Sequence, residues 1–183
     1  MASVGHIAVA VAAARARKES HRAVPRASSI LFWSLVAIAA DLDFIAFAFG
    51  VPYGAPLGHR GATHSLAFAA LLTTVIALVA RTRGQAAARI ALTAAIVTVS
   101  HPVLDSMTTY GIGCAFLWPF DATRYMSPWR LVPTVPSFAS LVTFEAFRIG
   151  VGELLLFSPI FVIALWPSHA RFRSRPAASA VDS

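Results

Sequence analysis

The sequence predicts an all-α fold, a polytopic membrane bundle of about four transmembrane helices plus a short N-terminal helix. Three observations support this prediction. Hydrophobic residues make up 57% of the 183 residues and charged residues only 13%, whereas soluble domains carry roughly 25% charged residues. The mean hydropathy is +0.70. The basic residues flank the apolar runs, as the loops of a membrane protein do.

The N-terminal run, MASVGHIAVAVAAARARK, predicts a short helix. Its stretch of about ten apolar residues is too short to cross a bilayer. Its charges follow the apolar run instead of preceding it, so a signal peptide is not expected. In an alternative arrangement, the helices pack as a compact bundle that is only partly embedded in the membrane, and this helix folds in as its fifth wall.

Four apolar segments are candidate spans, namely residues 30–50, 65–80, 86–104 and 149–166. Arg and Lys gather in the connections 15–29, 81–85 and 167–183. The positive-inside bias of membrane proteins places those connections in the cytoplasm. Connections 51–64 and 105–148 then face the other side, and the even number of spans puts both termini in the cytoplasm.

The long connection 105–148 is too polar and too rich in proline to be a span. It contains several aromatic residues that suit a loop or lid at headgroup level, among them Phe116, Trp118, Phe120, Tyr125, Trp129 and Phe138. We expect residues 1–170 to form a single helical membrane domain and residues 171–183 a basic, disordered tail.

Composition also argues against two classes of function. The net charge of +7 does not indicate nucleic-acid binding, because the loops that flank the spans already account for the basic residues. The chain has one cysteine, Cys114, so an internal disulfide and a cysteine-rich zinc site are both excluded.

Acidic and imidazole side chains interrupt or border the predicted spans at six positions, Asp41, Asp43, His59, His64, His101 and Asp105. Ionised groups inside hydrocarbon cost several kcal/mol, so they persist where partners or a function compensate for them. Carboxylate and imidazole groups are also ligands of zinc and related divalent metals. The pattern therefore indicates a metal site within the membrane.

Asp41 and Asp43 lie two residues apart in the first candidate span. Positions two apart on a helix point about 200° away from each other, so a regular helix cannot direct both carboxylates at one site. Either one is a ligand and the other supports it, or the helix loosens there. A buried acid paired with Arg60 is the simpler alternative.

The motif GHRGATHS predicts a tight turn, because its glycines tolerate conformations that other residues resist. Thr63 or Ser65 could then cap the helix that follows. The turn presents His59 and His64 at a helix N-terminus, where an anion is favoured. Arg60 could hold a phosphate there through two parallel hydrogen bonds.

His101 and Asp105 lie four residues apart and therefore on one helical face, so they could bind one ion. An ordinary His–Asp pair at a helix end is the alternative. Pro102 predicts a kink or a restart of the helix. Thr108 and Thr109 follow within one turn and could hydrogen-bond the metal ligands.

His6 is a further candidate ligand, although a histidine on an apolar face more often belongs to the core. The position of the other candidates along the spans supports a shared site. At about 1.5 Å per residue, the acids of the first span, the start of the second and the end of the third all lie in the outer half of the membrane.

Four motifs resemble, in the same order, those of the YdjM/YbcI family of bacterial inner-membrane metal-dependent hydrolases: GHIAVAVA, DLD, GHRGATHS and HPVLDSMTTYGIGCAFLWPF. The match runs from His6 to about Phe120, roughly two thirds of the chain. The resemblance implies a helical protein of the bacterial inner membrane with a metal-dependent hydrolase signature.

The layout is similar, more distantly, to zinc-dependent phospholipase C and the S1/P1 nucleases. By position, this likeness implies as ligands His6, Asp43 or Asp41, His59 or His64, His101 and Asp105. A further His-xxx-Glu pair of those enzymes does not follow here. One or two metal ions are therefore expected in place of three.

The functional hypothesis is a membrane-bound, metal-dependent hydrolase that acts on a phosphoester of a lipid or a lipid-linked molecule. Zinc is the expected metal, because it lowers the pKa of bound water toward neutrality. Asp43 is taken as the ligand and Asp41 as the catalytic base or water-orienting group, with the reverse left open. Arg60 would bind the phosphoryl oxygens. A small transporter or ion relay and a non-catalytic, metal-stapled protein are the alternatives.

Overall fold

The computed structural model describes residues 3–18, 22–135 and 142–167. Six α-helices make up most of this part of the chain, and no strand occurs in it. The α-helices are α1 (Ser3–Ala16), α2 (Ala27–Ala37), α3 (Phe44–Ala48), α4 (Leu66–Thr82), α5 (Ala87–Ser106) and α6 (Phe144–Leu165). Two short 3-10 helices are η1 (Ala39–Asp43) and η2 (Ala62–His64). The predicted all-α class is confirmed, whereas the predicted tail 171–183 lies outside the described residues.

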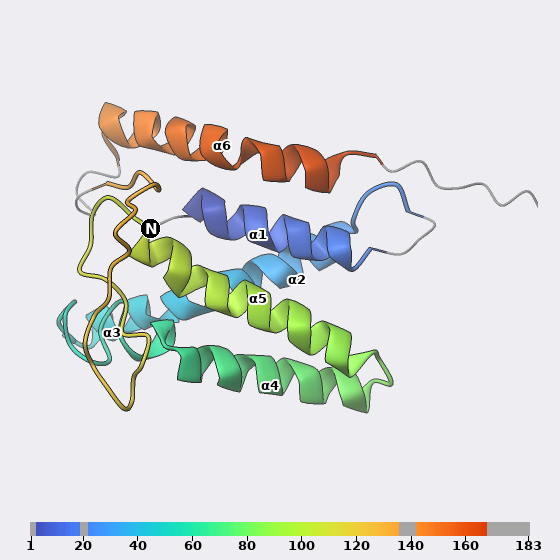
Figure 1. The fold of residues 1–183 in the computed structure, drawn as a ribbon, viewed down its shortest axis with the longest axis horizontal. Coiled ribbons are helices and arrows are strands. Elements are labelled where there is room, and N and C mark those ends of the chain that lie inside the picture. Colours follow the sequence, from blue (N-terminus) through green and yellow to red (C-terminus); the bar gives the residue numbers. More distant parts are fainter. Residues whose placement is uncertain (1–2, 19–21, 136–141, 168–183) are drawn as a thin grey trace, which may run out of the picture.

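The N-terminal helix α1 is an inner member of the bundle. It packs against α2, α5 and α6, and α4 packs against the far side of α5 (Figure 1). The contact face of α1 is made of alanine, with Ala8, Ala10 and Ala14 fully buried. Small residues let helix backbones approach closely, which is how helices associate in membranes. The folding of this helix into the bundle is therefore observed, whereas the partial embedding that the same alternative expects stays a prediction.

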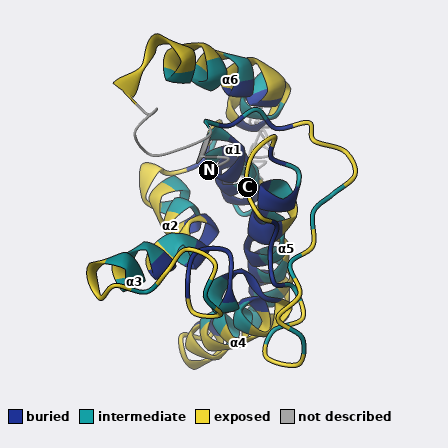
Figure 2. Ribbon diagram, turned by 90° about the vertical axis from the view of Figure 1, so that its left-hand side faces the viewer, coloured by how far each residue is buried: buried dark blue, intermediate teal, exposed yellow. Residues whose placement is uncertain are grey.

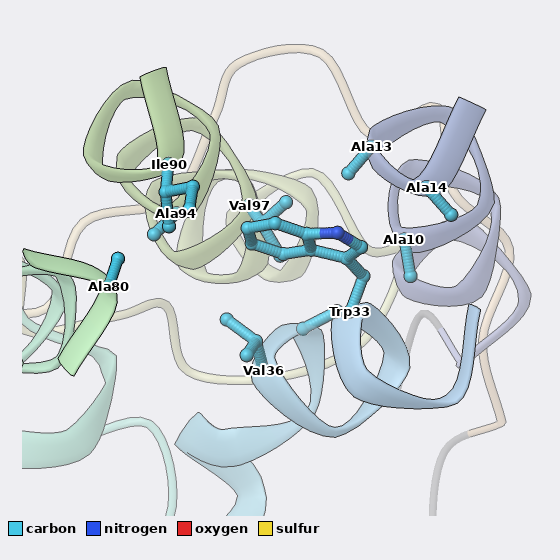
Figure 3. Close-up of a cluster of buried hydrophobic side chains, with 10 residues drawn as sticks. Ala10, Ala13, Ala14, Trp33, Val36, Ala80, Ile90, Ala94 and Val97 are labelled. Atoms are coloured by element: carbon cyan, nitrogen blue, oxygen red, sulfur yellow. The ribbon is translucent and has the colours of Figure 1, made fainter. Parts of the chain in front are cut away.

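One apolar cluster fills the space between α1, α2, α4 and α5. The indole of Trp33 lies between the alanines of α1 and Val97 of α5, and it is only 4% exposed (Figure 3). Away from this core the apolar side chains point outward, for example Leu71 on α4 and Leu155 on α6. Figure 2 shows the buried segments at the centre and the exposed faces of α3, α4 and α6 around them. Outward-facing apolar helices are typical of contact with lipid.

Two helices, α5 and α6, are each long and apolar enough to cross a membrane. The pair Ala27–Ala37 and Ala39–Ala48 would be a third span if the two parts count as one. Helix α4 is apolar but has only 17 residues. The predicted number of about four spans is therefore not confirmed, and the described residues contain two to three.

The first span bends just before the acidic pair. Its two halves, Ala27–Ala37 and Ala39–Ala48, meet at 53°, and the second half opens with the 3-10 helix η1, which ends in Asp41, Leu42 and Asp43. This is the loosening that the spacing of Asp41 and Asp43 predicts as one of two possibilities. By contrast, Pro102 does not restart α5, which runs through it to Ser106.

The two ends of the bundle differ in character. The connections after α1 and after α4 and the C-terminal end of α6 lie at one end, where the basic residues gather (Figure 1). The long loops 49–61 and 107–135 lie at the other end, together with α3 and the start of α1 (Figure 1). Which end faces the cytoplasm, and with it the predicted sidedness of the termini, stays a prediction.

Candidate metal centre

Histidine and aspartate side chains from four segments meet in the interior at the end of the bundle opposite the basic connections. His6 comes from α1, the acidic pair from η1, His64 from η2 and the His101–Asp105 pair from α5. His6, His64, His101 and Asp105 are each at most 1% exposed. The four-residue spacing places His101 and Asp105 on one face of α5, as the sequence predicts.

Four of these residues point single ligand atoms at one another. The Nε2 atoms of His64 and His101 lie 3.2 Å apart. Asp41 Oδ1 lies 3.8 Å from the first and 3.6 Å from the second. Asp105 Oδ2 lies 3.5 Å from His64 Nε2. Ligands about 2.0–2.1 Å from a tetrahedral zinc ion lie roughly 3.3 Å from each other, so these separations fit a metal site.

The opposite nitrogens of the two imidazoles are engaged elsewhere. His101 Nδ1 lies 2.6 Å from the backbone oxygen of Ala37, and His64 Nδ1 lies 3.1 Å from Asp43 Oδ2. A ring nitrogen that faces a carbonyl or carboxylate oxygen is the protonated one, which leaves Nε2 with a lone pair. Two lone pairs that face each other across 3.2 Å require a cation between them, either a proton or a metal ion.

The charges around His64 also favour a cation at this position. Burial lowers the pKa of the His64 imidazole, but the carboxylates of Asp105 and Asp43 outweigh it, so that the pKa is raised. Positive charge is therefore favoured at this point of the cluster.

Several buried polar atoms of the cluster have no hydrogen-bond partner within the described residues. They are Asp41 Oδ1, both carboxylate oxygens of Asp105, both ring nitrogens of His6 and Nε of Arg60. A buried polar group without a partner costs about 1–3 kcal/mol, more if it is charged. Arg60 Nε and Asp105 Oδ2 face each other as an ion pair at 3.1 Å, and the carboxylate oxygens and imidazole nitrogens among these atoms are of the kind that bind a divalent metal. His/Asp groups that could bind a metal are thus present, as the sequence predicts.

Asp43 has different surroundings from Asp41. Its Oδ1 lies 2.9 Å from His59 Nδ1, and its Oδ2 accepts hydrogen bonds from the Thr63 hydroxyl at 2.7 Å and the Arg60 backbone N–H at 3.2 Å. Asp43, His59 and His64 form a second group with the residue types of a metal site. The oxygens of Asp43 are already used by protonated donors, so the first group is the better fit.

Arg60 lies inside the molecule with a left-handed backbone, φ 64°, and is 1% exposed. Its Nε is 3.1 Å from Asp105 Oδ2, and its terminal nitrogens donate to Thr108 Oγ1 at 3.1 Å and to the Tyr110 carbonyl at 3.4 Å. A side chain at Gly111 would collide with the guanidinium. The Arg60 guanidinium therefore pairs with Asp105, and only the Arg60 backbone N–H contacts the acidic pair, at Asp43. Its predicted contact with phosphate stays a prediction.

His6 closes the cluster from the side of α1. Its ring stacks on His101 with centroids 3.8 Å apart, and its Nε2 lies 3.4 Å from Asp105 Oδ1. Glu153 of α6 holds the start of α1, because its Oε1 accepts the backbone N–H groups of Val4 at 3.0 Å and Gly5 at 3.1 Å. This contact joins residues that are 148 and 149 positions apart, so no local spacing in the sequence indicates it.

Two of the three threonines expected to support the site contact it. Thr63 contacts Asp43 and Thr108 contacts Arg60. Thr109 is exposed, and its hydroxyl accepts the backbone N–H of Thr134. The predicted cap of α4 is provided by the hydroxyl of Ser65, which accepts the N–H of Phe68.

Sequence reasoning missed Arg124, which fixes the loop that carries His59. Its guanidinium donates to the backbone oxygens of His59 at 2.9 Å and Ala55 at 3.0 Å. Its partners are distant in sequence, and no motif marks it.

Fold and cluster together define a class, that of helical membrane proteins with a buried His/Asp group suited to a metal ion. Within this class the chain belongs to the YdjM inner membrane protein family, whose model matches residues 1–176. It is similar to the inner membrane protein YbcI of Escherichia coli (strain K12), with 37% identity over 123 residues, 66% of this chain and 71% of that protein. No solved structure matches significantly. The predicted family and the inner-membrane character are thus confirmed.

Proposed function

We propose that the protein is a zinc-dependent hydrolase of the inner membrane that cleaves a phosphoester of a lipid or a lipid-linked molecule. The observation that carries the proposal is the convergence of His64 Nε2, His101 Nε2 and Asp41 Oδ1 within 3.2–3.8 Å, with the far nitrogens of both rings engaged. This is the ligand type and spacing that zinc prefers.

The ligands would be Asp41, His64, His101 and Asp105, with His6 beside them. A zinc ion bound there supplies Lewis-acid activation of water at neutral pH. This assignment of the acidic pair is the reverse of the one expected from the sequence. It makes Asp41 a ligand, and Asp43 the carboxylate that orients His59 and His64.

The protein's own residues prepare the site in two ways. Asp43 and the Ala37 carbonyl hold the rings of His64 and His101 so that both Nε2 atoms point inward. Arg60 holds the carboxylate of Asp105 and balances its buried charge. Asp41 is 18% exposed while the other three members are buried, so water and substrate would approach from its side.

A lipid phosphoester is favoured by the location of the site. The neighbouring loop 107–135 exposes Phe120 and Trp129, at 94% and 69%, in the part of the molecule where headgroups lie if α5 and α6 span the bilayer. Aromatic side chains favour that interface.

The test is zinc content together with hydrolysis. Purified protein should retain close to one equivalent of zinc or more and should hydrolyse phosphomonoester or phosphodiester lipids in mixed micelles. Asp105→Asn should lose both properties. Asp121→Asn is the matched control, because that carboxylate is outside the cluster and pairs with the Tyr125 hydroxyl. It should keep both.

Two outcomes would overturn the proposal in different ways. Zinc retention without any hydrolysis, combined with a lower melting temperature after chelation, would indicate that the metal only staples the helices. This outcome has structural support, because the cluster joins segments from α1 to α5. Absence of zinc from the native protein would remove the metal centre itself.

A further inference from the structure

A second polar site lies at the other end of α2, in the connection from α1. Residues 15–26 carry five Arg or Lys residues and one Glu. Two side chains fasten the backbone of this connection: Arg15 donates to the Ala23 oxygen at 2.9 Å, and Lys18 donates to the Arg22 oxygen at 3.0 Å. Residues 15–18 and 22–23 are thereby tied to each other, and three further arginines, Arg17, Arg22 and Arg26, lie around one pocket.

Those side chains line one open pocket of about 290 Å³, whose lining residues are Arg17, Arg22, Arg26, Ser28, Ser29 and Phe32. Its volume is close to the lower end of the range of small-molecule sites, roughly 300–1,000 Å³. Three guanidinium groups and two hydroxyls in one pocket provide many donors and a high positive charge. That combination matches a phosphate group, which guanidinium binds through paired hydrogen bonds.

The apolar residue that lines the pocket is Phe32 of α2, which is 45% exposed. Leu31 and Leu35 of the same helix do not line the pocket but are also exposed, at 61% and 56%. The candidate span Ala27–Ala48 begins at this pocket, so its charged part would lie at the membrane surface and its apolar part in the hydrocarbon. A soluble phosphate ion gains nothing from a neighbouring apolar surface, whereas the acyl chains of a lipid can pack against it.

We propose that this pocket binds the phosphate headgroup of an anionic phospholipid, whose acyl chains lie along the exposed apolar face of α2. Basic pockets between helices at a membrane surface recognise anionic headgroups in this way. Arg22 and Arg26 also make other contacts within the chain, so the binding comes from the combined charge of the pocket and not from an unpaired guanidinium.

The lipid site is separate from the metal centre. Ser28 and Asp41 lie at opposite ends of the α2–η1 segment, roughly 20 Å apart at 1.5 Å per residue. The two sites can therefore be tested independently, and failure of one leaves the other untouched.

The experiment is a titration of the detergent-solubilised full chain with phosphatidylglycerol or phosphatidylcholine, with bound lipids counted by native mass spectrometry. Wild type should bind phosphatidylglycerol about tenfold more tightly than the zwitterionic lipid or better. Arg17→Gln should weaken phosphatidylglycerol binding about fivefold, and the triple variant Arg17→Gln/Arg22→Gln/Arg26→Gln roughly a hundredfold.

The matched control is Arg81→Gln/Arg83→Gln/Arg89→Gln, which removes three charges at the end of α4, in the turn that follows it and at the start of α5, at the same end of the bundle. It should change phosphatidylglycerol affinity less than about twofold. An equal loss in both triple variants would overturn the site, because the charge of the whole end would then be responsible. Displacement of phosphatidylglycerol by millimolar inorganic phosphate would overturn the lipid assignment. If the triple variant fails to fold, the fivefold effect of Arg17→Gln alone decides.

Discussion

Asp41 and Asp43 stand two residues apart on the same short 3-10 helix, yet their carboxylates have opposite roles in the proposed site. Asp41 Oδ1 has no hydrogen-bond partner among the described residues and faces two imidazole Nε2 atoms. Asp43 is surrounded by donors from His59, Thr63 and the Arg60 backbone. A carboxylate with free lone pairs is a ligand, whereas one saturated by donors orients its neighbours.

This difference predicts unequal effects of the two conservative substitutions on zinc binding. Asp43→Asn should weaken zinc affinity about 10- to 100-fold, the usual effect of losing a group that orients a ligand. Asp41→Asn removes a ligand and should reduce the affinity further. Elemental analysis after dialysis against a graded series of chelators measures both. The opposite ranking would show that Asp43 is the ligand, as the working assignment from sequence has it.

Parts of the site that depend on local spacing could be predicted from sequence. The His101–Asp105 pair follows from two positions on one helical turn, and the cap by Ser65 follows from the glycine turn before α4. The choice between Asp41 and Asp43 could not be predicted, because it depends on the partners that the tertiary fold brings to each carboxylate. Asp41 faces two imidazole Nε2 atoms, whereas Asp43 meets the donors of the loop that follows α3.

At the scale of the helices, α1 is held in place at its first turn. Glu153 of α6 accepts the N–H groups of Val4 and Gly5, which have no partner within a helix at this position. Gly5 also lets Phe157 approach, since an added Cβ would lie 2.7 Å from the Phe157 Cζ atom. Because His6 follows directly, the docking of α1 on α6 determines where that imidazole lies.

Gly5→Leu should therefore destabilise the protein by about 1–3 kcal/mol through overpacking against Phe157. The control is Gly150→Leu on α6, where an added Cβ meets nothing within 4 Å. That change should be neutral, or stabilising by up to about 1 kcal/mol through helix propensity. Thermal melting of both variants measures the difference. Recovery of stability in Gly5→Leu/Phe157→Ala would assign the loss to this contact, and no recovery would contradict the assignment.

The presence of the helices could be predicted from the sequence, because apolar runs of helical length are a strong signal. The central position of α1 could not be predicted from the sequence. The helix is too short to be a span, yet its alanine-rich face is buried against α2, α5 and α6. The contacts of Glu153 with α1 and of Arg60 with Asp105 join segments that only the tertiary fold brings together. The predicted number of spans is not confirmed, because α4 has only 17 residues and is short for a bilayer.

For the whole molecule, the two ends of the bundle carry different chemistry. The connections rich in arginine and the proposed lipid pocket lie at one end, and the His/Asp cluster with its aromatic loop lies at the other (Figure 1). Basic loops are retained on the cytoplasmic side during insertion. We therefore predict that the His/Asp cluster opens to the outer face of the inner membrane.

Labelling of single cysteines in cells with a permeabilised outer membrane tests this orientation. Phe120→Cys lies in the aromatic loop at 94% exposure and should react with a membrane-impermeant maleimide in intact cells. Gln85→Cys lies in the exposed turn between α4 and α5 and should react only after lysis. The native Cys114 is an internal control, because it is fully buried and burial raises the pKa of its thiol, so it should stay unlabelled in both conditions. If Gln85→Cys is labelled in intact cells and Phe120→Cys is protected, the orientation in the membrane is the reverse of the predicted one. The metal centre would then have to act on substrates of the cytoplasmic leaflet.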